Sequence, residues 1–145
     1  MRAVIQRVRR ASVELDGVEA TSIGSGLLVL IGFSAQGASN QLAQMAHRIV
    51  NLRVFDDASG RLNRSLSEVA GELLVIPQVT LTARLAKGTR PSFHTAAAAT
   101  DAHRLFDEFI QRLRSIYPRV KTGVFQAQMV VHLDNDGPVT MVLDE

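Results

Sequence analysis

The run Leu27-Leu28-Val29-Leu30-Ile31-Gly32-Phe33 is apolar throughout, apart from one glycine. An uninterrupted apolar run of this length is typical of a strand that is buried on both faces of a sheet. A second run of the same kind, Leu73-Leu74-Val75-Ile76, lies about forty residues further on. We therefore predict a central buried strand at 27–33 and a second buried strand at 73–76.

Further strands and two helices are predicted on either side of these runs. Asp16-Gly17 is a strong hairpin signal between extended segments at 4–15 and 18–23. Helical spacing of apolar residues then marks two inner faces: Leu42, Met45, Ala46, Ile49 and Val50 in the first helix, and Leu105, Phe106, Phe109, Ile110 and Leu113 in the second. Three final strands are predicted at 120–125, 129–133 and 139–143.

These elements predict a single α+β domain over residues 1–145. The sheet is expected to be largely antiparallel and strongly curved, with a barrel-like core and two or three helices outside. A strict alternation of strands and helices is missing, and neither GxGxxG nor GxxxxGK[ST] occurs, so a Rossmann-type fold is excluded.

Composition narrows the class of protein. The chain has 145 residues and no cysteine, which excludes disulfides, a cysteine nucleophile and thiolate metal sites. It has no uninterrupted apolar region of signal-peptide type and no apolar run of about 18 residues, so we expect no membrane segment and a cytoplasmic protein. The net charge is only +2, but Arg84, Lys87, Arg90 and His94 fall in one segment that can hold phosphates.

The usual catalytic machinery is missing from the sequence. The four histidines have no metal-ligand spacing, and there is no GxSxG motif. Paired acids such as Asp56 and Asp57 lie at predicted turns, where aspartate is favoured for backbone reasons. We therefore expect no metal and no cofactor, and an enzyme of this sequence would act by positioning and backbone electrostatics.

Two short segments could still form a site. Pro77-Gln78-Val79-Thr80-Leu81 places polar side chains where a buried strand ends, either lining a pocket or simply kinking the strand end. Asn135-Asp136-Gly137-Pro138 is ordinary turn chemistry on its own. Arg7 could likewise be a surface cation, and Phe125 and Met129 could be plain core residues.

Taken in order, these segments resemble the D-aminoacyl-tRNA deacylases along the whole chain. The resemblance is carried by the opening Met1-Arg2-Ala3-Val4-Ile5-Gln6-Arg7-Val8, by Pro77 to Leu81, by Lys87-Gly88-Thr89-Arg90-Pro91-Ser92-Phe93, and by Asn135-Asp136-Gly137-Pro138-Val139-Thr140. It implies a homodimeric, cofactor-free hydrolase that cleaves the ester between a D-amino acid, or glycine, and the 3′ end of tRNA, with active sites at the subunit interface.

The resemblance also implies roles for individual residues. Gln78 and Thr80 would hold the terminal adenosine and its ester, with Thr80 positioning rather than attacking, beside Pro77 and Val79. Phe125 would stack on the terminal adenine, and Met129 matches the family's methionine. Gly137 and Pro138 would project into the partner's pocket and exclude L side chains, and Arg7 would hold their loop in place.

Three departures from the family pattern leave alternatives open. Pro77 stands where the family has serine, Val79 stands where it has phenylalanine or methionine, and Gln126-Ala127-Gln128 replaces Gly/Ala-Ala-Asp. Pro77 resembles a sister group of deacylases that remove L-alanine from threonine tRNA. Arg7 and the Gly137-Pro138 context favour the D-specific branch over that group. A tRNA- or DNA-binding module that has lost catalysis through Pro77 and Val79 is a further alternative.

Overall fold

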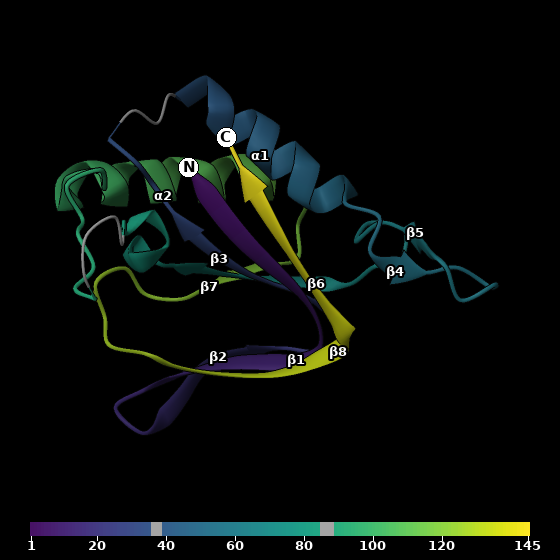
Figure 1. The fold of residues 1–145 in the computed structure, drawn as a ribbon. Helices are drawn as coiled ribbons and strands as arrows, with labels where there is room; N and C mark the ends of the chain where they lie inside the picture. The colour runs from purple at the N-terminus through teal and green to yellow at the C-terminus, as the bar shows by residue number, and fades with distance from the viewer. Residues whose placement is uncertain (36–38, 85–88) are drawn as a thin grey trace.

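The computed structural model describes residues 1–35, 39–84 and 89–145. A mixed sheet curls into a nearly closed barrel, and two helices pack on its outside (Figure 1). The elements in chain order are β1 (Arg2–Leu15), β2 (Val18–Ile23), β3 (Gly26–Gly32), α1 (Ser39–Asn51), β4 (Phe55–Asp56), β5 (Leu62–Arg64), β6 (Glu72–Pro77), the 3-10 helix η1 (Val79–Thr82), α2 (Ala99–Ile116), β7 (Val120–Thr122) and β8 (Val130–Asp144).

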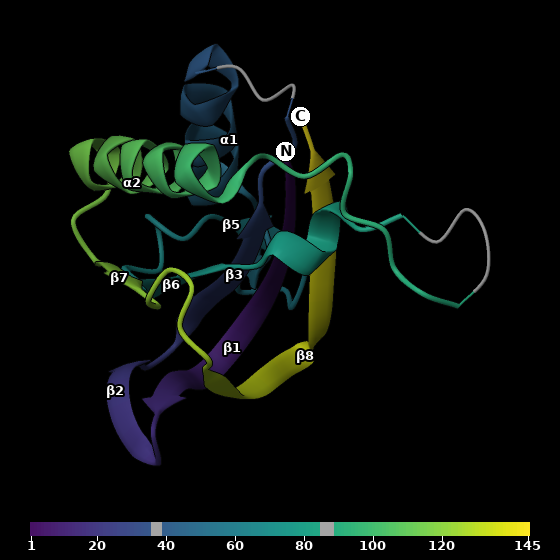
Figure 2. The ribbon, with the colours of Figure 1, turned by 90° about the vertical axis from the view of Figure 1, so that its left-hand side faces the viewer.

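The long strand β1 bends the sheet because it is shared between two sets of neighbours. Its first half pairs with β3, with Ile5 opposite Val29, and its second half pairs with β2, with Val13 opposite Thr21. On its other edge β8 follows it along almost its whole length (Figure 2). All three pairings are antiparallel, as predicted for this part of the sheet.

The other half of the sheet is parallel. β3 pairs with β6, and β6 pairs with β7, both in parallel register. Parallel neighbours need a long crossover connection, and α1 and α2 lie in the two crossovers. The predicted α+β class, barrel-like curvature and outer helices are confirmed, whereas the sheet is more mixed than the sequence indicated.

Both apolar runs are buried on two sides, which explains why they contain no polar residue. Leu27, Val29 and Ile31 of β3 face the core under the helices, where Phe109 and Met45 are fully buried. The alternate side chains of β3 and β6 face a second cluster inside the barrel: Leu28, Leu74 and Ile76. The two strands therefore separate two hydrophobic cores, as expected for the predicted strands that are buried on both faces.

The prediction of three final strands was wrong. β7 ends at Thr122, and the chain from Val130 to Asp144 is a single strand. Its pairing with β1 jumps from Val8 opposite Asn135 to Gln6 opposite Thr140, so the residues between bulge out without reversing the strand. Within the described residues, no helix is long and apolar enough to cross a membrane.

Candidate active site

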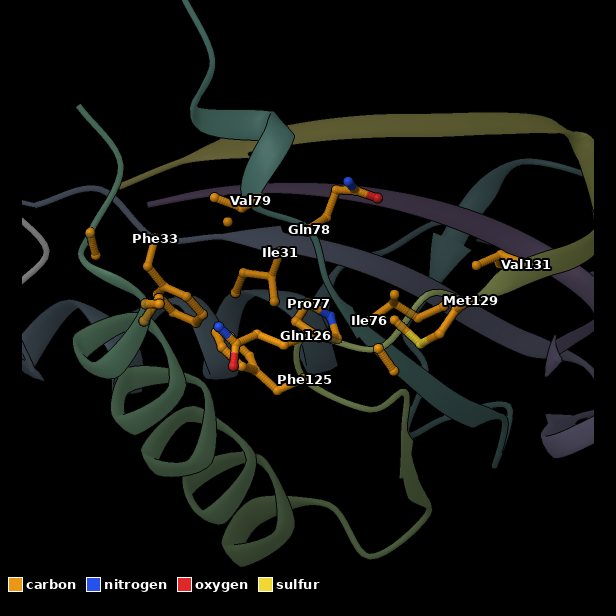
Figure 3. A pocket seen from close by; sticks show the side chains of 15 residues that line it. Ile31, Phe33, Ile76, Pro77, Gln78, Val79, Phe125, Gln126, Met129 and Val131 are labelled. Carbon is orange, nitrogen blue, oxygen red and sulfur yellow. The ribbon is translucent and has the colours of Figure 1, made fainter. Parts of the chain in front are cut away.

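A pocket of about 400 Å³ opens beside the first turns of α2, where β3 and β6 end (Figure 3). Its wall is mainly apolar and includes Ile31, Phe33, Ile76, Phe125, Met129 and Val131. Pockets of this size and polarity commonly bind small ligands or parts of larger ones. Pro77, Gln78 and Val79 lie on the same wall, so one of the two segments predicted to form a site lines this pocket.

The polar edge of the pocket is formed by Pro77 and Gln78, where β6 ends. Gln78 donates its main-chain N–H to the Ile31 carbonyl at 2.7 Å, which ties this edge to the end of β3. A Cβ on Gly32 would lie 2.6 Å from the Gln78 carbonyl oxygen, so only glycine permits this approach. β3 lies beside Pro77 on one edge, but on the other edge β7 stops opposite Val75, so no strand on that edge requires the N–H that proline lacks.

At the start of η1, two main-chain N–H groups have no hydrogen-bond partner. Among the described residues, the amides of Val79 and Thr80 donate to no acceptor, as expected for the first turn of a 3-10 helix. The Gln78 side-chain amide donates to the Thr80 hydroxyl, and Val79 is 53% exposed. Free N–H groups at a pocket edge can bind a carbonyl oxygen that becomes negatively charged.

A tight turn after β7 forms the opposite wall. Ala127 donates its N–H to the Val124 carbonyl at 3.4 Å, and this closes the turn that carries Phe125. The Phe125 ring stacks on His103 of α2, with centroids 4.5 Å apart and planes 2° from parallel. Phe125 is half-buried: it packs against the core under the helices and also lines the pocket, so its role in binding stays a prediction.

Arg7 is the most enclosed cation near these segments. Its side chain is 8% exposed and lies under the bulge of β8. It donates to the Val54 carbonyl at 2.8 Å, to the Asp136 carbonyl at 2.9 Å and to the Asp56 carboxylate at 3.2 Å. Arg7 is therefore not a surface cation, and it ties the bulge to the loop before β4.

The bulge carries Gly137 and Pro138, which are joined by a cis peptide bond. Asn135 spans it: its side chain accepts from the Val139 N–H at 2.8 Å and donates to the Thr140 hydroxyl at 3.1 Å. Gly137 has a φ of +135°, and a Cβ there would lie 2.7 Å from the Val139 side chain. Asn135 therefore stabilises the bulge through an Asx-type hydrogen bond, and position 137 accepts only glycine without strain.

A second depression lies on the other side of η1 and is lined by Thr80, Leu81, Phe93, Pro91, Val4 and Val142. Phe93 and Val142 are 43% and 58% exposed, which is unusual for large apolar side chains on one face. Arg2 also lines it, and its hydrogen bond to Asp144 at 2.7 Å lowers the pKa of that carboxyl.

The basic segment is only partly described. Arg84 and Ser92 pair across an isolated antiparallel bridge. Arg84 and Arg90 are exposed, whereas Lys87 lies outside the described residues. The prediction that this segment meets tRNA phosphates stays a prediction.

The structure brings together most of the predicted site residues but not all of them. Pro77, Gln78, Val79, Phe125 and Met129 line one pocket, and Thr80 joins it through Gln78. The remaining three do not line this pocket within a single chain: Gly137 and Pro138 lie in the bulge of β8, and Arg7 holds the Asp136 carbonyl directly before them.

One pocket residue, and one residue that supports the pocket from outside, were missed by the sequence reasoning. Gln126 lines the pocket, and His103 stacks on Phe125. The replacement of a family glycine or alanine by Gln126 was a visible signal, whereas nothing in the spacing of His103 indicated a stacked ring. In the part of the chain that the structure describes, no three His, Asp or Glu side chains gather in a way that could hold a metal ion.

Comparisons with known proteins identify relatives of this chain along its whole length. A family model described as D-Tyr-tRNA(Tyr) deacylase matches residues 4–144. The D-aminoacyl-tRNA deacylase of Geobacter sulfurreducens is 46% identical over 144 residues, which cover 99% of this chain and 95% of that protein. The D-aminoacyl-tRNA deacylase of Chlorobaculum parvum is 50% identical over 146 residues, with coverage of 99% and 97%.

Two solved structures share the fold. The structure of a c-Myc DNA Unwinding Element Binding Protein superposes with a TM-score of 0.96 at 40% identity, over 100% of this chain and 99% of that one. A probable eukaryotic D-amino acid tRNA deacylase has a TM-score of 0.88 at 19% identity, over 99% and 98% of the two chains, and this similarity concerns the fold alone.

Proposed function

Since the chain belongs to the D-Tyr-tRNA(Tyr) deacylase family, we propose that it hydrolyses the ester bond of D-aminoacyl-tRNA. Water adds to the ester carbonyl, the bond to the ribose oxygen breaks, and the products are a free D-amino acid and free tRNA. Glycyl-tRNA is a second substrate, because glycine has no side chain for the site to exclude. The reaction is a proofreading step that keeps D-amino acids out of translation.

The observation that carries this proposal is the meeting of distant motifs in one pocket. The exit of β6 contributes Gln78 and Val79, and the turn after β7 contributes Phe125. Aromatic rings that are partly exposed in such pockets are suited to stack on an unpaired base. The terminal adenine of tRNA would therefore lie against Phe125, and the ester would lie near η1.

Side-by-side deacylation of four esters tests this function. D-tyrosyl-tRNA and glycyl-tRNA are expected to be cleaved, while L-tyrosyl-tRNA and L-alanyl-tRNA survive under the same conditions. Released amino acid is followed over time, with a no-enzyme sample as the control for spontaneous hydrolysis. Survival of both D-tyrosyl-tRNA and glycyl-tRNA would refute the proposal.

Main-chain electrostatics account for catalysis at η1. The amides of Val79 and Thr80 have no acceptor among the described residues, so they can stabilise the oxyanion that forms when water adds. The ribose 2′-hydroxyl of the tRNA assists that addition. The Thr80 hydroxyl accepts a hydrogen bond from Gln78 and contacts no imidazole or carboxylate in the described structure, so no base activates it as a nucleophile.

A Thr80→Ala substitution distinguishes a Thr80 that only positions the ester from a Thr80 that attacks it as the nucleophile. If Thr80 only positions the ester, kcat should fall by roughly tenfold, about the worth of one neutral hydrogen bond. Loss of a true nucleophile would lower it by roughly a million-fold. Thr80→Ser keeps the hydroxyl and serves as the matched control in single-turnover assays of D-tyrosyl-tRNA. Complete loss of turnover in Thr80→Ala, with the serine variant active, would contradict the positioning role.

Chirality is selected by Gly137 and Pro138 of a second copy of the chain. The resemblance to the deacylase family assigns these residues to the partner's pocket in a homodimer, and in support of this they do not line the pocket of their own chain. In that arrangement their main-chain oxygens occupy the side of the α-carbon where an L side chain would lie. Selection by exclusion requires no contact with the D side chain, so many D-amino acids are accepted.

The exposed apolar face supports the homodimer. Phe93 and Val142 are solvent-exposed beside η1, and Thr80 lies in the same depression. A two-fold interface there would cover both side chains and bring the partner close to the ester site. Sedimentation equilibrium that found only monomers at concentrations where the ester is cleaved would contradict the assembly.

One further candidate has an observation in its favour. The 40% identical solved structure is that of a protein named for DNA binding, so nucleic-acid binding without hydrolysis is the second candidate function. Intact aminoacyl-tRNA bound tightly and released uncleaved would support it. An L-alanyl-tRNA deacylase remains the third outcome of the four-ester assay. The enclosed Arg7 favours the D-specific branch, because the resemblance assigns that residue to the chiral filter.

A further inference from the structure

Gln126 has a backbone conformation that its residue type rarely adopts. Its φ is +60°, and it follows Phe125 in the turn that the Ala127–Val124 hydrogen bond closes. Turns that need a positive φ at this position normally use glycine or asparagine. A residue held in an unfavourable conformation at a pocket wall points to a role for its side chain.

The side chain of Gln126 is also left without a partner. It lines the pocket, is exposed, and makes no hydrogen bond to any described residue. Figure 3 shows its carboxamide beside Phe125 and Phe33, across the pocket from Gln78 and Val79 on the η1 side. The surroundings are mainly apolar, so the amide can only be satisfied by water or by a ligand.

We propose that Gln126 recognises the terminal adenine of the substrate by hydrogen bonds from its carboxamide. This inference rests on the proposed function, which places the base against Phe125 and the ester at η1. A carboxamide has an acceptor oxygen beside an NH2 group that can donate, and these match the adenine N6 amino group and a neighbouring ring nitrogen. Phe125 contacts the face of the base, and Gln126 reads its edge.

The same chemistry predicts selectivity between bases. Guanine has an acceptor, O6, where adenine has its amino group, so a carboxamide cannot make the same pair of bonds. Purine riboside lacks the amino group altogether and differs from adenosine in nothing else. Gln126 is therefore a specificity-determining residue, and the hydrogen bond that its carboxamide oxygen accepts should be lost when the 6-amino group is absent.

Binding of two nucleotides tests this role without any turnover. Adenosine 5′-monophosphate and purine riboside 5′-monophosphate are titrated by calorimetry into the wild-type protein, Gln126→Ala and Gln126→Gly. The glycine variant suits the positive φ, so an unchanged or raised Tm shows that the turn is intact. Gln128→Ala is the matched control, because Gln128 is exposed and does not line the pocket.

We expect the wild-type protein and Gln128→Ala to bind the adenine nucleotide about fivefold more tightly, which is the scale of one hydrogen bond. Both Gln126 variants should bind the two nucleotides equally. Selectivity that persists in the Gln126 variants, or a wild-type protein that shows none, would overturn the inference. A wild-type protein that selects adenine but leaves D-tyrosyl-tRNA intact would sink the proposed function and leave the role of Gln126 standing.

Discussion

Replacing Gly137 with alanine is expected to lower the preference for D- over L-tyrosyl-tRNA by tenfold or more, equivalent to about 1.4 kcal/mol. The φ of +135° disfavours any L residue, and the new Cβ would lie 2.7 Å from the Val139 side chain and 3.2 Å from the Arg7 guanidinium. The bulge must therefore shift. If its main-chain oxygens form the chiral filter, the L ester then gains access, and initial hydrolysis rates of the two esters measure the change.

The control for this prediction is Gly60→Ala. Gly60 also has a positive φ, at +73°, but a Cβ there meets nothing within 4 Å. Any loss of stability from the backbone conformation is shared by both variants, whereas a change in chirality is expected only in Gly137→Ala. An unchanged D/L ratio in a folded Gly137→Ala protein would remove Gly137 from the filter.

The buried half of the fold could be predicted because it depends on local pattern. The runs at 27–33 and 73–76 are apolar on both faces, and both strands separate two cores. Such runs are also typical of parallel strands, so the parallel pairing of β3 and β6 had a signal in the sequence. The hairpin signals elsewhere in the chain instead favoured the prediction of a largely antiparallel sheet.

The final strand could not be predicted from local pattern. Asn135-Asp136-Gly137-Pro138 has the composition of a turn, and a turn predicts two strands. The structure continues as one strand because Asn135 satisfies the Val139 N–H across the bulge and β1 pairs with both sides of it. Long-range pairing therefore overrides the turn signal.

Some residues of the candidate site could likewise be predicted from the sequence, and others could not. Gln78 and Thr80 follow a buried strand, so their place at a pocket edge could be predicted from the chain itself. Gln126 could not be placed, because its importance depends on a positive φ and on an apolar surrounding that only the folded chain provides. The roles of all these residues in hydrolysis stay predictions until the variants are measured.

Arg7→Ala is expected to destabilise the protein by about 3 kcal/mol. The substitution leaves the Val54 and Asp136 carbonyls without their donor and removes the cation between Asp56 and Asp136. An unsatisfied buried acceptor costs roughly 1–3 kcal/mol, and a broken buried ion pair adds to this, although solvent screens the two half-exposed carboxylates. Urea unfolding at one fixed protein concentration measures the difference, because dimerisation would make stability depend on concentration.

Arg10→Ala is the matched control on the same strand. Arg10 pairs with Glu19 at 2.8 Å, but its side chain is 63% exposed, so its removal should cost less than about 1 kcal/mol.

Arg7→Ala should also lower the D/L ratio, since Arg7 holds the Asp136 carbonyl directly before Gly137. Arg7→Lys keeps the charge but cannot donate to three acceptors in this fork geometry, so it should restore only part of the stability. Equal unfolding midpoints for Arg7→Ala and Arg10→Ala would mean that the enclosed network does not hold the bulge.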